Sequence, residues 1–357
     1  MNRTKKGAAA LEACEIVEYW MTDAAPALLA TVIGVEGHAY RKPGAMMLLY
    51  ADGRKRGTIS PGCLEGDLLE RTSGLLATGR CEMVRYNMKS EEDAVWGEAV
   101  GCGGIVDVLL EPLAGAAADA LRELGFRLRA GEGASLLRYR HGDGIAYEVR
   151  ASQVGDAALP RAARSARLLF AQSIAPRPRL LLFGAGYDAE PVARIASALG
   201  FRVTVADWRP GLLSGERFPG MALVCGSPAE IALSLGIGPA DYALVMGHQL
   251  QRDRALIETL LSVKPAYVGV IGSARRIAHL FEGLPMPPFV HAPVGLPIGA
   301  EGPEEVAISV AAELVAIRRK GKGGDEDGRV KYRGYLPGGR TERPDGQAEA
   351  VPGVCGW

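Results

Sequence analysis

The sequence shows no excess of either charge and no long apolar run. Its 41 lysines and arginines balance 41 aspartates and glutamates, so global charge gives no indication of a nucleic-acid or anionic membrane partner. No stretch reaches the apolar length of a membrane span, and no leader-like apolar region follows the opening residues MNRTKKGAAA. These absences predict a cytoplasmic protein that binds neither nucleic acid nor membrane.

Metal-binding and disulfide motifs are also missing. The chain contains no C-x-x-C, no H-E-x-x-H and no Cys/His cluster with the spacing of metal ligands. Scattered free thiols in a reducing compartment explain the cysteine pattern better than a disulfide scaffold does. The six cysteines are Cys14, Cys63, Cys81, Cys102, Cys225 and Cys355.

A glycine-rich turn between two apolar runs is the strongest motif of the chain. Residues 180–183 have the composition of a buried strand, and Gly184, Gly186 and Ala189 then complete the pattern G-x-G-x-x-A. A helical pattern follows, and a second strand ends at Asp207. The glycines of such a unit allow a tight bend and bring a phosphate close to the helix N-terminus. An acid at the end of the second strand accepts hydrogen bonds from ribose hydroxyls and repels a 2′-phosphate.

This motif has two interpretations. In the first, the turn binds a nucleotide or another phosphorylated ligand. In the second, the glycines only make a tight turn between a strand and a helix of a parallel sheet. Because fold and ligand are separate claims, the sequence predicts the fold and leaves the ligand open.

The chain is long enough for two domains. Residues 179–319 alternate predicted strands and helices, which indicates an α/β domain with a Rossmann-like, doubly wound parallel sheet. Residues 8–150 lack this alternation and predict a smaller N-terminal α+β domain. A proline-punctuated, arginine-rich segment at 151–178 is expected to be a linker. Residues 320–357, rich in Gly, Pro and charge, are expected to be a disordered tail.

Two cysteines of the N-terminal domain lie in glycine-rich turns. Cys63 follows a Pro-Gly pair and enters a predicted helix, whose N-terminus favours the thiolate form. Cys102 lies in the run Gly-Cys-Gly-Gly, where missing side chains would let a bulky ligand approach the sulfur. Either cysteine is as readily explained as a small buried residue in a turn. Glu65, in the first turn of the helix after Cys63, needs no role beyond offsetting the helix dipole.

Loops and strand ends supply further candidate ligand contacts. Arg41 lies in a basic loop ending in Pro-Gly, which either holds a phosphate or is simply solvated. His248 and Ser273 each follow a predicted strand of the second domain. Ligands of parallel sheets bind beyond the carboxyl ends of the strands, so both residues are expected at the mouth of the ligand crevice. A structural role competes with ligand binding for His248.

Both halves of the chain, in this order, resemble the xanthine dehydrogenase accessory factor (XdhC/CoxI) family over about residues 10–320. Pro61 and Tyr187 depart from the pattern, since many members carry Gly and His there, and indicate a subfamily. In the first half the similar segments are residues 37–44, SPGCLEGD at 60–67, Trp96-Gly97 and GCGG at 101–104. In the second half they are FGAGYDAEPVARIASALGFRVTVAD, MGHQLQRDRALI, YVGVIGSARR and HAPVGLPIGAEGPEEVAISVAAELVA.

The resemblance implies a chaperone that binds and protects molybdenum cofactor, as molybdopterin or a dinucleotide form, rather than a catalyst. Members support exchange of an oxo for a sulfido ligand with a cysteine desulfurase. They then deliver the cofactor to an apo molybdenum hydroxylase of the xanthine dehydrogenase type. Carried over by motif, Cys63 and Cys102 become candidates for contacting the molybdenum centre, for which soft thiolates are suited. Gly184 and Gly186 would hold the phosphate or nucleotide end, and a homodimer would supply the shielded surface that a handover needs.

Two other functions stay open. One is an NAD(P)-dependent oxidoreductase that binds the nucleotide with Gly184, Gly186 and Asp207 and uses His248 as acid and base. Its weakness is that no Tyr-x-x-x-Lys pair follows the glycine motif. The other is a regulatory nucleotide sensor whose first domain is only an interaction module. The sequence leaves open the cofactor form, the target hydroxylase and whether both domains share one ligand.

Overall fold

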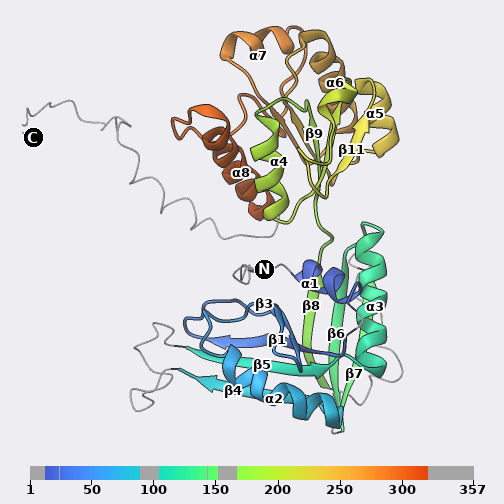
Figure 1. The fold of residues 1–357 in the computed structure, drawn as a ribbon, viewed down its shortest axis with the longest axis vertical. Coiled ribbons are helices and arrows are strands. Elements are labelled where there is room, and N and C mark those ends of the chain that lie inside the picture. The colour runs from blue at the N-terminus through green and yellow to red at the C-terminus, as the bar shows by residue number, and fades with distance from the viewer. Residues whose placement is uncertain (1–12, 24, 89–103, 143, 152–166, 321–357) are drawn as a thin grey trace, which may run out of the picture.

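The computed structural model describes residues 13–23, 25–88, 104–142, 144–151 and 167–320 and has a mixed α/β fold (Figure 1). Within these residues one sheet is parallel and six-stranded, and two smaller sheets are antiparallel. The predicted fold class, a Rossmann-like parallel sheet plus a smaller α+β region, is confirmed. Cys102 and the expected tail at 321–357 lie outside the described residues.

A five-stranded antiparallel sheet forms the centre of the N-terminal part, in the order β3-β2-β1-β5-β4. Its central strand β1 alternates between two cores, because Leu28 and Ala30 point to one face and Ala27 and Leu29 to the other. Helix α2 covers the first face, and α1 and α3 cover the second. The elements are α1 (Ala13–Trp20), β1 (Ala27–Glu36), β2 (Met46–Tyr50), β3 (Lys55–Gly57), α2 (Glu65–Thr78), β4 (Glu82–Asn87), β5 (Ile105–Pro112) and α3 (Gly115–Arg129).

A three-stranded sheet packs beside it, in the order β7-β6-β8, with β6 (Ala134–His141), β7 (Gly144–Ala151) and β8 (Arg167–Ile174). Strand β8 lies inside the segment that the sequence predicts as a linker, and it pairs with β6 along its length. Its side chains alternate between exposed and buried only over residues 171–174, where Gln172 and Ile174 are buried. A stretch this short is a weak strand signal in the sequence, and backbone pairing with β6 defines the rest of the strand.

The parallel sheet of the C-terminal part has the strand order β11-β10-β9-β12-β13-β14. In chain order this is 3-2-1-4-5-6, the doubly wound arrangement with its switch point between β9 and β12. The elements are β9 (Arg179–Phe183), α4 (Ala189–Ala198), β10 (Arg202–Asp207), the short 3-10 helix η3 (Pro210–Leu212), β11 (Ala222–Cys225), α5 (Pro228–Leu235), β12 (Tyr242–Val245), α6 (Leu250–Val263), β13 (Tyr267–Val270), α7 (Ala274–Leu280), β14 (Val290–His291) and α8 (Gly302–Lys320).

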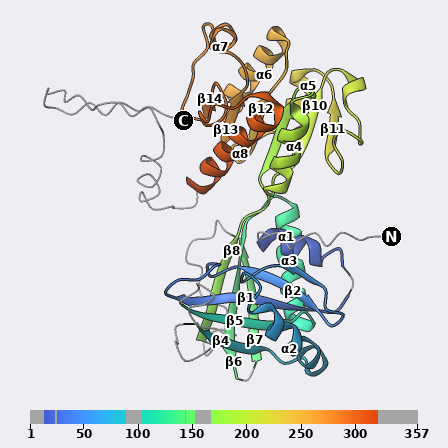
Figure 2. The ribbon, with the colours of Figure 1, turned by 60° about the vertical axis from the view of Figure 1, so that its left-hand side comes forward.

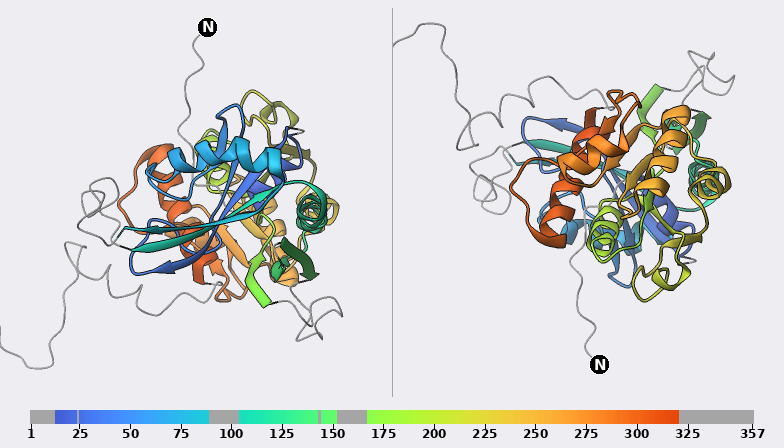
Figure 3. Two further views of the ribbon diagram at one scale, coloured as in Figure 1. Left: turned by 90° about the horizontal axis from the view of Figure 1, so that it is seen from below. Right: turned by 90° about the horizontal axis from the view of Figure 1, so that it is seen from above.

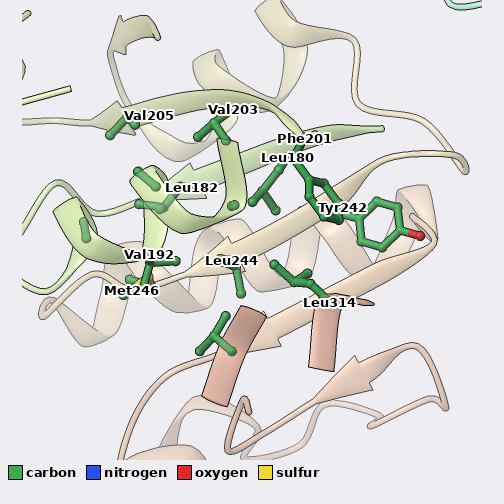
Figure 4. Close-up of a cluster of buried hydrophobic side chains, with 14 of the residues drawn as sticks. Leu180, Leu182, Val192, Phe201, Val203, Val205, Tyr242, Leu244, Met246 and Leu314 are labelled. Carbon is green, nitrogen blue, oxygen red and sulfur yellow. The ribbon is translucent and has the colours of Figure 1, made fainter. Parts of the chain in front are cut away.

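Helices cover both faces of this sheet. Figure 4 shows one face, where Val192 of α4 and Leu314 of α8 pack against Leu182 and Leu244 of the central strands. Helices α5, α6 and α7 pack on the other face. Full burial of an aliphatic side chain contributes about 1.5–3 kcal/mol to the free energy of folding. Because many such side chains are buried in these two layers, the layers hold the strand ends at the switch point in fixed register.

The two parts are joined at the amino edge of the parallel sheet. Strand β9 begins shortly after β8 ends, and because the strands are parallel, all their amino ends lie at this edge. Glu18 of α1 forms ion pairs across the join with Arg202, at 3.3 Å, and with Arg177, at 3.8 Å. The carboxyl edge therefore faces away from the N-terminal part (Figures 1 and 2). Seen from below, α2 lies on the outward face of the five-stranded sheet (Figure 3). None of the described helices is long and apolar enough to cross a bilayer.

Candidate functional site

The glycine turn after β9 is fixed by contact with the end of β12. Gly184 has φ +105°, and a Cβ there would lie 2.6 Å from the backbone of Met246 and Gly247. Its N–H donates to the Ala206 carbonyl of β10 at 2.8 Å. A residue with a side chain would be strained in conformation and would push the two strand ends apart. The turn is therefore built for a close backbone approach at the switch point.

The N-terminus of α4 follows this turn. The side chain of Asp188, the N-cap residue, does not cap the helix. In the first turn the Ala189 N–H donates to the Gly186 carbonyl at 3.2 Å and Pro191 has no N–H, which leaves the Glu190 N–H for an anion. On the other side of the turn, Arg217 donates to the Gly186 carbonyl at 3.1 Å and pairs with Glu190 at 2.6 Å. The turn is thus held from the segment after β10.

Asp207 at the end of β10 is fully engaged inside the protein. One oxygen accepts from the Ala185 N–H at 2.8 Å, and Arg209 donates to both oxygens through its backbone N–H, Nε and Nη2 at 2.8–3.0 Å. The side chain is 1% exposed. Burial works to raise the pKa of Asp207, but the bonds from Arg209 and Ala185 outweigh it and hold that pKa below its ordinary value.

This arrangement differs from the role that the sequence predicts for Asp207. A carboxylate offers about four lone-pair sites, and all four have protein donors here, so none remains for ribose hydroxyls. Arg209 also offsets the negative charge with which Asp207 is expected to repel a 2′-phosphate. Sequence spacing located the acid but gave no sign of the arginine two residues later as its partner.

A cavity of about 150 Å³ opens at this edge, beside Gly184 and Asp207. His248 lines it, is mostly exposed, and lies 3.9 Å from Asp188. Ser273 does not line the cavity, because its hydroxyl caps α7 by accepting from the Arg276 N–H at 3.3 Å. The lining residues are Phe183, Gly184, Asp207, Trp208, Arg209, Gly247, His248, Gln249, Arg252 and Asp253.

Asp253 is a cavity residue that the sequence analysis missed. It is 1% exposed, one oxygen accepts from Arg276, and Oδ1 has no hydrogen-bond partner among the described residues. Burial raises the pKa of Asp253 to about 6, although Arg276 opposes the shift. In the sequence, one acid in the first turn of a helix looks only like a partner of the helix dipole, so no local signal could have identified it.

Replacing Asp253 with asparagine is expected to change how stability depends on pH. The folded pKa of about 6 exceeds the unfolded value near 4, so wild type loses stability as pH rises between them. The variant does not titrate there, and its unfolding free energy relative to wild type should rise by about 2 kcal/mol from pH 4 to pH 7. Chemical denaturation across this range measures the difference. The exposed Asp119→Asn serves as control, and a difference for Asp253→Asn that is independent of pH would contradict the expectation.

The loop that carries Cys63 is held by a buried carboxylate. Glu65 is 2% exposed and accepts from Ser60 Oγ, from the Ser60 N–H at 3.2 Å and from Thr58 Oγ1 at 3.0 Å. Ser60 Oγ in turn accepts from the N–H groups of Gly62 and Leu64. Glu65 therefore shapes the turn, beyond the dipole role expected for it. Cys63 is half-buried at the N-terminus of α2.

Within one chain the structure brings Gly184, Asp207 and His248 to one cavity and separates them from Cys63 and Arg41. Cys63 lies on the α2 side of the five-stranded sheet, while Gly184 and Gly186 lie at the far edge of the parallel sheet (Figure 1). Arg41 lies in the loop between β1 and β2, also in the N-terminal part. The cavity at Gly184 is lined by the C-terminal part alone. Among the described residues no group of three or more His, Cys, Asp or Glu could hold a metal ion.

A larger cavity, of about 510 Å³, lies at the join between the two parts. Its arginines are already engaged. Arg177 donates to the Gly200 and Phe201 carbonyls, and Arg318 donates to the Leu199 carbonyl at 2.7 Å. This cavity is on the amino edge, away from the glycine turn, and two of its arginines, Arg177 and Arg202, pair with Glu18 across the join.

Comparison with known proteins matches both parts. Residues 20–87 match the XdhC and CoxI family, and residues 180–314 match the XdhC Rossmann domain. The chain is 36% identical over 315 residues to a probable xanthine dehydrogenase subunit of Bacillus subtilis (strain 168), and the match covers 84% of this chain and 96% of that relative. The chain belongs to the XdhC and CoxI family.

Other members and structures extend the comparison. The "molybdenum cofactor insertion chaperone PaoD" of Escherichia coli (strain K12) is 26% identical over 82% of this chain and 83% of its own length. A crystal structure described as a xanthine dehydrogenase from Bacillus halodurans superposes with a TM-score of 0.78 at 33% identity, over 87% of this chain and 96% of that one. The family and the fold class that the sequence resemblance implies are thereby confirmed.

Proposed function

We propose that this chain is an accessory chaperone that binds molybdenum cofactor and delivers it to a molybdenum hydroxylase of the xanthine dehydrogenase type. The observation that carries the proposal is the alignment with the insertion chaperone PaoD over 83% of that protein, which includes both halves in the same order. Similarity to the xanthine dehydrogenase subunit of Bacillus subtilis supports the class of target. The cofactor is cargo here, so the protein has to hold and release it.

The cavity at the carboxyl edge suits the phosphate end of such a cargo. The first turn of α4 follows the close turn at Gly184 and leaves the Glu190 N–H for an anion. Arg209 and Arg252 add positive charge to the wall of the same cavity. No acid and base pair with mutual hydrogen bonds lines this cavity, since His248 and Asp188 are 3.9 Å apart. The chemistry present is that of binding and release.

Cys63 supplies a soft ligand for the metal end. It is half-buried in a turn whose shape Ser60 and Glu65 hold, at the N-terminus of α2. In the proposed cycle this thiol contacts the molybdenum centre during exchange of oxo for sulfido, with a cysteine desulfurase as the source of sulfur. Cys102 is proposed for the same role from its motif. Transfer to the apo hydroxylase follows.

A homodimer would bring the two ends of the proposed cargo site together. In one chain Cys63 and Gly184 lie at opposite ends of the molecule (Figures 1 and 2). One cofactor that touches both therefore needs Cys63 of one copy beside Gly184 of another, or a rotation of the two parts about the short join. We propose the first arrangement, because the ion pairs of Glu18 with Arg202 and Arg177 hold the join as it stands.

A nucleotide-binding oxidoreductase is the second candidate, favoured by the Rossmann-like sheet and its open cavity. It predicts saturable binding of NADPH or NADH together with turnover of a carbonyl substrate. Binding of molybdenum cofactor without nicotinamide turnover supports the chaperone instead.

Replacing Cys63 and Cys102 together with alanine is expected to lower delivery of cofactor at least about tenfold, because the metal end loses its soft ligands. The measurement incubates purified protein with molybdenum cofactor, checks co-elution, and then scores activation of an apo xanthine dehydrogenase.

Cys81→Ala is the matched control. Burial raises the pKa of the Cys81 thiol, which contacts the Tyr147 hydroxyl at 3.9 Å, so this thiol is a poor ligand and its loss should leave delivery unchanged. If the double variant binds and delivers cofactor as well as wild type does, the assignment of Cys63 and Cys102 is wrong. If wild type does not retain the cofactor, the chaperone function itself is wrong.

A further inference from the structure

The wall of the carboxyl-edge cavity carries a positive charge that has no carboxylate partner. Its two buried acids each have an arginine of their own, since Asp207 pairs with Arg209 and Asp253 pairs with Arg276. Arg252 lines the same cavity, and no carboxylate among the described residues lies within ion-pair distance of it. The cavity thus has an excess of one guanidinium.

Arg252 is held in place by an aromatic ring. Its guanidinium carbon lies 4.4 Å from the centroid of the Trp208 ring, and that of Arg209 lies 5.4 Å from the same centroid. Such cation–π contacts fix the direction of a guanidinium without consuming its N–H donors. Arg252 therefore presents its donors to the cavity in a preset orientation, at the first turn of α6.

Arg209 has donors left as well. Nε and Nη2 bond to Asp207, which leaves Nη1 without a carboxylate in the part of the chain that the structure describes. Two guanidinium groups that contact one tryptophan make a multidentate donor set, which matches the oxygens of a phosphate better than those of a neutral diol.

We infer that this cavity binds a phosphomonoester, with Arg252 as its principal ligand and Arg209 as the second, and that it rejects a ribose diol. A ribose diol is rejected because its usual acceptor at this position is the carboxylate at the end of the second strand, here Asp207. Both oxygens of Asp207 already accept hydrogen bonds from the protein. The inference rests on the proposed function for the location of the cargo site. It adds which chemical group of the ligand this cavity binds.

A nucleotide and its nucleoside, which differ by one phosphate, test this inference directly. Adenosine 2′-monophosphate carries a phosphomonoester where adenosine has a free diol. Titration calorimetry on the full chain should show the monophosphate binding at least about tenfold more tightly, and Arg252→Met should remove that preference. Arg122→Met is the matched control, because Arg122 also lies over a tryptophan, Trp20 at 5.5 Å, but on α3.

Equal affinity for adenosine 2′-monophosphate and adenosine, no binding of either, or an unchanged preference in Arg252→Met overturns the inference. A second arm identifies the source of the phosphate by comparing molybdopterin, whose phosphate is a monoester, with its cytosine dinucleotide, whose phosphates are esterified. Tighter binding of molybdopterin, lost in Arg252→Met, assigns the site to the pterin phosphate. A preference for adenosine 2′-monophosphate over adenosine without binding of either pterin keeps the inference and removes the proposed chaperone function.

Discussion

Gly184→Ala is expected to destabilise the C-terminal part by about 3 kcal/mol and to abolish ligand binding at the carboxyl edge. The residue has φ +105°, where alanine is strained, and the new Cβ would lie 2.6 Å from the Met246 carbonyl and the Gly247 nitrogen. These are backbone atoms at the end of β12, so they cannot rotate away as a side chain can. Relief requires β9 and β12 to separate at the switch point.

The measurement pairs thermal unfolding with titration of the ligand that wild type binds most tightly. Gly186→Ala separates the two effects, because the atoms near its Cβ are the side-chain ends of Asp188, at 2.8 Å, and His248, at 3.4 Å. Those ends can rotate, so stability should change little while a phosphate loses its close approach to the backbone. Gly215→Ala, with open space around it, is the neutral control. A Gly184→Ala variant as stable as the Gly215→Ala variant would show that the strand ends are not held as described.

The local geometry of this turn could be predicted from the sequence because neighbouring residues determine it. A buried strand, two glycines and a helical pattern occur in one continuous segment, and the structure has β9, the turn and α4 in that order. The same reasoning placed Asp207 at the end of β10 correctly. It did not predict the protein partners of Asp207, because hydrogen-bond partners depend on side chains and backbone that meet only after folding.

Three features lay beyond sequence reasoning for the same physical reason. The role inferred for Arg252 depends on its contact with Trp208, which follows β10. It also depends on the pairing of the two cavity acids, Asp207 and Asp253, with other arginines. Strand β8 is defined by pairing with β6 rather than by its own periodicity. The opposite placement of Cys63 and Gly184 follows from the direction of the chain at the join between the two parts, which no local pattern encodes.

Arg138→Met is expected to cost about 3–5 kcal/mol of stability in the N-terminal part, an effect larger than that of most single substitutions. Arg138 of β6 is 0% exposed and its Nε donates to both oxygens of Glu111 on β5 at 2.9 Å. Its Nη2 reaches Thr31 of β1 at 3.4 Å. The pair thus joins the three-stranded sheet to the five-stranded sheet. Without the arginine, Glu111 would be a buried charge with no cationic partner.

The pH dependence and a double variant decide whether charge or packing is responsible. In Arg138→Met, burial would raise the folded pKa of Glu111 above its unfolded value, so the variant should regain stability as pH falls toward the unfolded pKa near 4.3. Adding Glu111→Leu removes the uncompensated charge and should restore most of the loss at neutral pH, because well-packed apolar replacements of buried pairs are often neutral or stabilising. Chemical denaturation at pH 5 and pH 7 measures both effects. A double variant as unstable as Arg138→Met would mean that the pair acts through its shape, by filling the space between the sheets, and not through its charges.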